Sequence, residues 1–421
     1  MLEQFFLRPA TVDRIHASWI GGAIEHYVTW LAENDYATRN VFSRVPILVK
    51  FGIFTSEKGA KDWNELPSYV ESFVEVWLIE HGKEEASALK RNEAARAIRN
   101  PIQQMLNLII PVGRLSSVRH ELPVPFLDGV PDFFTFLRRD RGLREATIVQ
   151  YQHYLRRLES FLRNIKMQTL SELSPAVVNA FITESGQRVD KRSVQSLCSI
   201  LKVFLRYLYR IGIHTRDLSR IIESPRSYRL AKIPRSISWA SVQQMLEAVD
   251  RRNAAGKRDY AMLLLLVAYG LRAREVAALT LDDLDWKRER LYIRARKAGH
   301  SSVYPLSSVV GEGILDYLQR GRPKTDERRL FLRIPAPHRP VAWHVVSSRA
   351  KHYLCKAGIE VPRPGSHTLR HSCVQRLVEA RFSFKTIGDY VGHRTPDATQ
   401  IYAKVNIEAL REVALGGEEI L

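Results

Sequence analysis

The sequence predicts a mainly α-helical protein with a small β-sheet, in which two helical segments precede a mixed α/β segment. Apolar residues recur at spacings of three and four along most of the chain, as they do in amphipathic helices. Two proline-containing breaks without a helical period, residues 111–125 and 224–238, separate the three segments. Two short apolar runs, residues 291–295 and 302–306, predict the strands of a β-hairpin.

The two breaks predict three domains, a number that a chain of 421 residues allows. We expect a helical N-terminal domain over residues 1–110, a helical domain over 126–223 and a mixed α/β domain over 237–421. Hydrophobic residues make up 45% of the chain, which is enough for packed cores.

The first third of the chain matches the second at one constant offset in residue number, which indicates that the N-terminal domain duplicates the next helical unit. The matched pairs include Asn40 with Thr147, Leu48 with Leu155, Phe51 with Leu158, and Val70 with Val177. Two short helical units that share a period can also match by chance. Duplication and coincidence are therefore both open at the level of sequence.

The second segment predicts helices over residues 130–137, 147–162 and 193–209, each with an apolar stripe. A further helix opens at Ser174-Pro175, because serine suits the N-cap and proline the first turn.

The third segment begins with helices predicted over residues 240–249 and 258–269. The hairpin follows, with its turn at Lys297-Ala-Gly-His300, and helices then dominate to the end of the chain. Asn406 can cap a final amphipathic helix that ends at Gly416-Gly417.

Lysine and arginine exceed aspartate and glutamate by 19, which favours a polyanionic partner such as nucleic acid over a mere contribution to solubility. The excess is uneven, because residues 1–120 are neutral overall whereas residues 128–236 and 237–421 each carry a net charge of +10. The basic surplus therefore begins only after the first third of the chain.

The sequence does not fit the classes of membrane proteins or disulfide-rich proteins. The longest apolar run, residues 262–271, is far shorter than the roughly 20 residues that span a bilayer. The N-terminus lacks the pattern of a secretory signal, so we expect a cytoplasmic protein without membrane contact. Its cysteines, Cys198, Cys355 and Cys373, form no CxxC pair, so neither a zinc site nor a disulfide framework is expected, and Cys373 is predicted to pack in a helix.

Residues suited to phosphodiester chemistry follow one another in the third segment, at spacings of 25, 70, 3, 23 and 9. They are Arg272, Lys297, His367, Arg370, His393 and Tyr402. Arginine grips two phosphate oxygens with its planar fork, lysine or histidine transfers protons, and a tyrosine hydroxyl can act as nucleophile. Each residue alone is an ordinary surface or core residue, and the order and type of the set carry the prediction.

The neighbouring residues predict how three of these side chains are presented. Gly270 permits the turn before Arg272, and Glu275 can either hold the Arg272 guanidinium or cap the next helix. His367 and Arg370 lie three residues apart on a predicted helix and therefore share one face.

At these residues the sequence resembles the tyrosine recombinase (phage integrase) family of site-specific DNA recombinases. The stretches that carry the resemblance are YGLRAREVAALTLDDLDW, RKAGHSSVYPL, SHTLRHSCVQRLVEA and VGHRTPDATQIYAKV. They span residues 269–405, the whole catalytic domain by analogy. Residues 128–225 resemble the family's helical core-binding domain.

The resemblance implies a role for each residue of the set. Tyr402 would attack the scissile phosphate to give a 3′-phosphotyrosine, while Arg272 and Arg370 hold the phosphoryl oxygens. Lys297 would protonate the leaving 5′-oxygen. Because the covalent bond to tyrosine conserves energy, neither ATP nor any other cofactor or metal is implied.

The two histidines complete the implied site. His367 would assist proton transfer or bind phosphate, and His393 would donate a hydrogen bond to a phosphoryl oxygen.

The resemblance also implies double-stranded DNA as the partner, held between the core-binding and catalytic domains. The break that joins these domains carries cations suited to phosphate contacts, namely Arg226, Arg229, Lys232 and Arg235. Family members act as homo-tetramers on two paired sites, in some cases with related recombinases. The segment 406–415 would pack either on a neighbour or on its own domain.

The leading hypothesis is therefore a recombinase of mobile DNA, either an integrase or a transposase. The alternatives are a type IB topoisomerase-like DNA relaxing enzyme and a catalytically silent DNA-binding regulator. The sequence discloses neither the target DNA, nor the direction of the reaction, nor an accessory protein. For residues 1–110, duplication of a DNA-clamping unit favours DNA contact and the neutral charge favours protein assembly.

Overall fold

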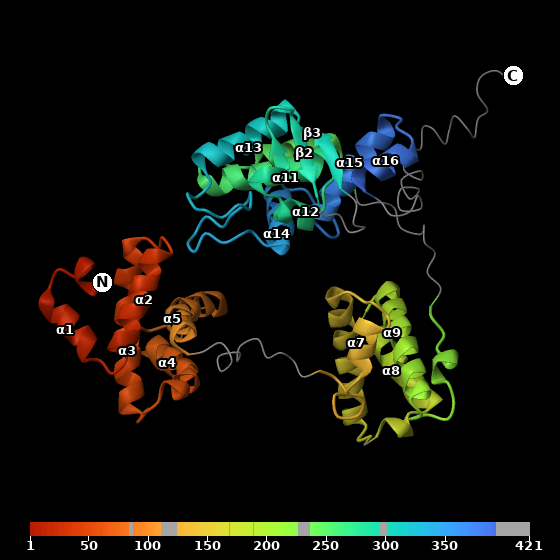
Figure 1. Cartoon of the computed structure of the whole chain (residues 1–421), viewed down its shortest axis with the longest axis horizontal. Helices are drawn as coiled ribbons and strands as arrows, with labels where there is room; N and C mark the ends of the chain where they lie inside the picture. Colours follow the sequence, from red (N-terminus) through yellow and green to blue (C-terminus); the bar gives the residue numbers. More distant parts are fainter. Residues whose placement is uncertain are drawn as a thin grey trace. The chain divides into compact units, whose positions relative to one another are not determined.

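The computed structural model describes residues 1–83, 87–110, 124–167, 169–187, 189–225, 236–294 and 301–392. These residues are mostly helical and include a small antiparallel sheet, which confirms the predicted fold class (Figure 1). The chain divides into two compact units, one formed by Met1–Ile109 with Lys232–Leu421 and the other by Ile110–Ala231. The finer division into three domains stays a prediction.

The N-terminal part, residues 1–109, is a helical bundle. Its described elements are the 3₁₀ turn η1 (Leu2–Gln4), α1 (Pro9–Ala17), α2 (Gly21–Glu33), α3 (Thr38–Glu57), the 3₁₀ turn η2 (Trp63–Glu65), α4 (Leu66–Glu80) and α5 (Ala88–Ile109). Helices α2, α3 and α5 pack together, and α4 packs on α5. The buried Tyr27 hydroxyl donates to Gln104 Oε1 at 2.9 Å, and Arg44 donates to both of these oxygens at 2.8 Å. Burial raises the pKa of Tyr27 to about 12, so this hydroxyl stays protonated.

The unit Ile110–Ala231 is also helical. It contains α6 (Phe133–Arg139), α7 (Glu145–Asn164), η3 (Leu170–Glu172), α8 (Pro175–Gln187), α9 (Lys191–Arg210) and η4 (Leu218–Ile221). The predicted helices are confirmed, and the Ser174 hydroxyl accepts a hydrogen bond from the Val177 N–H at 3.4 Å. Helix α9 begins two residues earlier than predicted, because the Asp190 carboxylate accepts from the Ser193 N–H at 2.9 Å and caps it.

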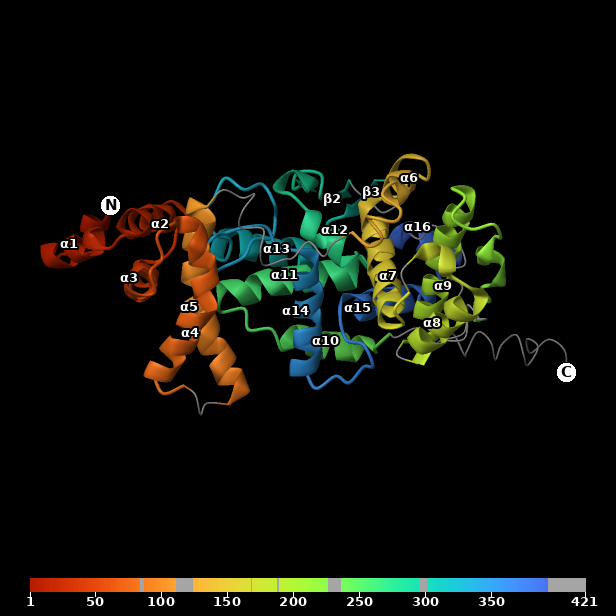
Figure 2. The same cartoon turned by 90° about the horizontal axis from the view of Figure 1, so that it is seen from below.

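The described residues of 236–294 and 301–392 pack around α11 (Ala254–Ala268), whose apolar residues are buried nearly all round. The other described helices are α10 (Trp239–Glu247), α12 (Ala273–Ala278), α13 (Ser308–Arg320), α14 (Trp343–Lys356), α15 (Ser366–Glu379) and α16 (Phe384–Val391). Helix α14 contacts α10, α11 and α12 (Figure 2). Helix α11 starts four residues before its predicted start, because the Asn253 side chain accepts from the Gly256 N–H at 2.8 Å.

The sheet lies in this same part of the chain. Strands β1 (Leu284–Asp285), β2 (Arg290–Ile293) and β3 (Ser302–Pro305) are antiparallel in the order β1-β2-β3, with Leu291 opposite Tyr304. The predicted pair of strands is confirmed, while its turn around Lys297 lies outside the described residues. Strand β1 was not predicted, because two residues are too few to show an alternating pattern.

A buried charged group ties α11 to α14. Arg258 donates to Asp259 Oδ1 at 3.0 and 2.7 Å and to the Leu332 carbonyl at 3.2 Å, so its charge is paired where water is absent. The Tyr353 hydroxyl of α14 donates to Asp259 Oδ2 at 3.1 Å. Burial, together with the Asp259 charge, raises the pKa of Tyr353 to about 12.

None of the helices in the described ranges has both the length and the apolar character that crossing a bilayer requires.

Candidate active site

Arg272 stands where the chain turns from α11 into α12. Gly270 adopts a left-handed conformation with φ of +58°, and Arg272 then occupies the N-cap position of α12. The Arg272 N–H donates to Glu275 Oε2 at 2.9 Å, and its guanidinium donates to Glu275 Oε1 at 2.7 Å. Glu275 is only 5% exposed, so one buried carboxylate both caps the helix and fixes the arginine. Both roles considered for Glu275 from sequence are thus confirmed.

Arg370 lies on α15 and is 6% exposed. Its guanidinium donates to the Gly270 carbonyl at the end of α11 and, at 2.7 Å, to the Val391 carbonyl at the end of α16. His367 precedes it by one turn of the same helix, which confirms the predicted helical placement of the pair.

Both guanidiniums reach the C-terminal end of α16. Arg272 donates to the Gly392 carbonyl at 2.8 Å, one residue beyond the Val391 carbonyl that accepts from Arg370. Gly392 ends the helix with φ of +66°. The carbonyl end of a helix carries partial negative charge, so it stabilises the two cations and holds them side by side.

Close packing holds the end of α11 against α15 and α16. A Cβ atom added to Gly270 would lie 3.1 Å from Val391 Cγ1 and 3.2 Å from Cys373 Sγ. The Cys373 thiol donates to the Ala268 carbonyl at 3.6 Å. Burial raises the pKa of Cys373 to about 12, so this thiol is a packing group, as predicted, and a poor nucleophile.

The His367 imidazole stays neutral more readily than a free histidine. Partial burial of the ring lowers its pKa from the ordinary 6.5, and the charges of Arg370 and Arg272 lower it further. A neutral imidazole can donate from one nitrogen and accept at the other, so His367 can pass a proton near the two guanidiniums.

Three tyrosines that the sequence did not single out connect the elements around this point. The Tyr390 hydroxyl of α16 donates to the Ala268 carbonyl at 3.0 Å, and the Tyr304 hydroxyl of β3 donates to the Tyr390 carbonyl. The Tyr269 hydroxyl donates to the Pro305 carbonyl at 2.8 Å. Nothing in the sequence distinguishes these residues from core tyrosines, since their partners are backbone carbonyls distant in the chain.

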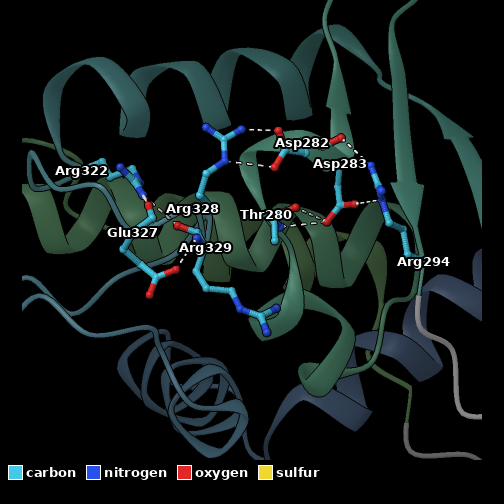
Figure 3. Close-up of polar contacts among 8 residues, drawn as sticks. All are labelled: Thr280, Asp282, Asp283, Arg294, Arg322, Glu327, Arg328 and Arg329. Atoms are coloured by element: carbon cyan, nitrogen blue, oxygen red, sulfur yellow. Dashed lines mark hydrogen bonds and ion pairs between the residues drawn. The ribbon is translucent and has the colours of Figure 1, made fainter.

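The base of the hairpin is fixed by ion pairs and capping bonds (Figure 3). Arg294, at the end of β2, donates to Asp283 Oδ1 at 2.7 Å and to the Asp282 carbonyl at 3.0 Å. Asp283 also accepts from the Thr280 N–H and hydroxyl at 2.9 and 2.8 Å. Arg294 lies three residues before Lys297 in the sequence. Sequence reasoning missed this pair, because an exposed arginine and an aspartate eleven residues apart show no local pattern.

The structure brings together Arg272, His367 and Arg370. The other predicted catalytic residues, Lys297, His393 and Tyr402, lie outside the described residues, as do the predicted DNA contacts Arg226, Arg229, Lys232 and Arg235. In the described ranges, no group of three or more His, Cys, Asp or Glu side chains is placed to hold a metal ion.

Comparisons with known proteins agree with this arrangement. The phage integrase family matches residues 235–409, and the N-terminal SAM-like domain of phage integrases matches residues 130–212. A Sinorhizobium fredii protein named as a putative integrase/recombinase, y4rA, is 37% identical over 280 residues, covering 66% of this chain and 68% of its own. Tyrosine recombinase XerD of Lacticaseibacillus casei is 29% identical, covering 67% of this chain and 95% of its own.

Comparison of the fold with solved structures points to the same class of protein. A lambda integrase tetramer bound to a Holliday junction matches with a TM-score of 0.53 at 16% identity, covering 71% of this chain and 87% of the integrase chain. The chain therefore belongs to the phage integrase family, the tyrosine recombinases, whose members are enzymes that cleave and rejoin DNA.

Gly270→Ala should destabilise the protein and slow any reaction that needs both arginines. The new Cβ adds strain at a positive φ and pushes on Val391 and Cys373, at a cost of about 1–3 kcal/mol in the free energy of unfolding. Gly358→Ala is the matched control, because Gly358 has φ of +70° with nothing within 4 Å of an added Cβ. Chemical denaturation of both variants measures the difference, and equal losses would contradict the packing argument.

The pKa of His367 should rise towards 6.5 in Arg370→Gln and stay low in Arg370→Lys, which keeps the charge. NMR titration of the imidazole measures both shifts. Because the folded pKa is depressed, the stability from a neutral His367 is present above pH 6.5 and is lost as the pH falls through the folded pKa. A downward shift in Arg370→Gln would show that Arg370 does not lower the pKa.

Proposed function

We propose that this chain is a site-specific tyrosine recombinase that cleaves and rejoins DNA strands through a covalent 3′-phosphotyrosine at Tyr402. The convergence of Arg272 and Arg370 on the end of α16 supports this most strongly. Arginine pairs of this kind stabilise charge on a phosphoryl group as it develops in the transition state. In this chain Glu275 and backbone carbonyls hold Arg272 and Arg370 before any DNA binds, so the two arginines need little reorganisation during the reaction.

The proposed cleavage step exchanges one phosphodiester for another. The Tyr402 oxygen forms a bond to phosphorus as the bond to the 5′-oxygen breaks, while Arg272 and Arg370 hold the non-bridging oxygens. Lys297 gives a proton to the leaving 5′-oxygen, and His367 assists transfer of the tyrosine proton. His393 donates to a phosphoryl oxygen. Attack by a 5′-hydroxyl on the phosphotyrosine reverses these steps and rejoins the strand.

The DNA partner is double-stranded, and we propose that the basic segment 224–238 contacts its backbone through Arg226, Arg229, Lys232 and Arg235. The chain acts as a homo-tetramer on two paired sites, as the lambda integrase tetramer on a Holliday junction suggests by analogy. Its biological setting is the integration or transposition of a mobile element in the cytoplasm. Residues 237–421 act as the catalytic domain and residues 126–223 as the core-binding domain.

The type IB topoisomerase-like alternative shares the tyrosine chemistry and differs in acting as a single copy on one duplex. The silent-regulator alternative requires loss of a catalytic residue, and every position of the predicted set holds the expected residue type.

Tyr402→Phe should abolish covalent protein–DNA adducts on a nicked duplex taken from the DNA that flanks the gene. Phenylalanine keeps the ring and removes the nucleophilic oxygen. Gel electrophoresis under denaturing conditions measures the adduct. Tyr36→Phe is the control, because it makes the same substitution at a residue outside the predicted catalytic set. It removes the Tyr36 hydroxyl and keeps the aromatic ring, whose centre lies 4.8 Å from the Arg44 guanidinium carbon.

Absence of an adduct with the unaltered protein on DNA that it binds would contradict both enzymatic readings and favour the regulator. Strand exchange between two duplexes, assayed with the unaltered protein, separates a recombinase from a topoisomerase-like enzyme, which relaxes supercoiled DNA without exchange.

A further inference from the structure

The end of α16 is held by more than the two arginines of the candidate active site. The last carbonyls of a helix have no partner within the helix, so side chains from other elements can bind them. The Val391 and Gly392 carbonyls accept from the arginines. The carbonyl of the preceding residue, Tyr390, accepts from the Tyr304 hydroxyl of β3. One helix end therefore contacts both arginines and the hairpin.

Tyr304 is packed tightly where the hairpin meets α16. Its side chain is 3% exposed, and its ring lies 5.0 Å from the ring of Tyr390, with an angle of 84° between the two planes. The Tyr390 hydroxyl in turn donates to the Ala268 carbonyl at the end of α11. An edge-to-face pair of rings with a hydrogen bond at its end restricts both the distance and the orientation between β3 and α16.

A second tyrosine ties the same strand to the end of α11. The Tyr269 hydroxyl donates to the Pro305 carbonyl at 2.8 Å and accepts from the Ser307 N–H at 3.1 Å. Its ring lies 5.0 Å from the ring of Tyr304. Tyr269 is the C-cap residue of α11 and directly precedes the turn at Gly270. Strand β3 is thus bonded to both of the helix ends that meet at the arginines.

The hairpin carries the proposed general acid, because Lys297 lies in the sequence between the end of β2 and the start of β3. The ion pair of Arg294 with Asp283 joins β2 to the 3₁₀ turn η5 (Leu281–Asp283) before β1, and so fixes the hairpin within its own sheet. The two tyrosine hydroxyls instead relate the hairpin to the arginines. Proton transfer to the leaving oxygen requires the acid and the phosphate-binding groups to keep one geometry.

We propose that Tyr304 and Tyr269 are positioning residues, whose hydroxyls hold the hairpin that carries Lys297 in a fixed place relative to the two arginines. The inference rests on the proposed function, because it gives both tyrosines a part in protonation of the leaving 5′-oxygen. Both hydroxyls act through backbone carbonyls, that of Tyr390 on α16 and that of Pro305 on the hairpin. They set the arrangement of the site and leave the reacting atoms to other groups.

The test compares Tyr304→Phe with the unaltered full chain on two versions of one nicked duplex, taken from the DNA that flanks the gene. One version has the ordinary 5′-oxygen at the scissile phosphate and the other has sulfur in its place. A 5′-thiolate leaves without a proton, because a thiol is far more acidic than an alcohol, so the sulfur duplex does not need the general acid. Tyr304→Phe keeps the buried ring and should slow single-turnover cleavage of the ordinary duplex about tenfold or more, but that of the sulfur duplex less than about twofold.

Further variants separate positioning from stability. Tyr269→Phe should give the same pattern as Tyr304→Phe, because it releases the end of the same strand. Adding Tyr304→Phe to Lys297→Met should cause little further loss on the ordinary duplex, since both changes act through one group. Tyr353→Phe on α14 is the matched control, because Tyr353 is 7% exposed in the same core and its hydroxyl donates to Asp259. This control should change cleavage of the two duplexes alike.

Hydrogen exchange of the full chain without DNA tests the tie independently of any reaction. Tyr304→Phe should speed the exchange of backbone amides in β2, in β3 and at the end of α16, because the bond between these elements is lost. Tyr353→Phe should leave the same amides unchanged. Thermal unfolding of both variants shows whether they lose similar overall stability, which separates local loosening from a general destabilisation.

Equal losses on the ordinary and sulfur duplexes, or no loss on either, would overturn the proposal, since the hydroxyls would then act on stability alone or not at all. Unchanged exchange of the hairpin amides in Tyr304→Phe would overturn it as well. If the unaltered protein forms no adduct at Tyr402 on either duplex, the proposed reaction is contradicted. Faster exchange in Tyr304→Phe would in that case still support the tie between the hairpin and α16.

Discussion

The site depends on one constraint, namely that the ends of α11 and α16 meet at the same arginine. Arg370 is buried on α15 and donates to the Gly270 and Val391 carbonyls, so a shift of either helix would break a hydrogen bond of a buried charged group. Gly270 makes the approach possible, because its φ of +58° is one that other residues rarely adopt and because an added Cβ would press on Val391 and Cys373 at 3.1 and 3.2 Å. Arg272 follows two residues later and is aimed at the adjoining Gly392 carbonyl by the same turn.

This arrangement also sets the electrostatics. Burial of the ring lowers the pKa of His367, and the charges of the Arg370 and Arg272 guanidiniums beside it lower that pKa further. Donors held rigidly in such a place stabilise developing negative charge without having to be rearranged. The tyrosines Tyr269, Tyr304 and Tyr390 support this rigidity by joining the hairpin and α16 to the end of α11.

Much of the fold could be predicted because it follows from local chemistry. The periodicity of α7 and α9, the cap at Ser174 and the turn at Gly270 are each determined by a few neighbouring residues. Helix starts set by Asp190 and Asn253 were misplaced by two to four residues, because the caps lie before the apolar pattern. Strand β1 and the pairing of Arg294 with Asp283 escaped prediction, since both depend on residues brought together by the hairpin.

The sequence by itself determined the family and the chemical identity of the site, because the order and type of Arg272, His367 and Arg370 with their neighbours are properties of the chain. It also contained the constant offset between its first two thirds, but could not separate duplication from chance. Only the tertiary structure showed that the same offset takes both ends of α3, Thr38–Glu57, to both ends of α7, Glu145–Asn164, which favours duplication. Only it showed which carbonyls hold the arginines. The physical reason is that such partners, as far apart as Arg272 and Gly392, meet through packing rather than through local pattern.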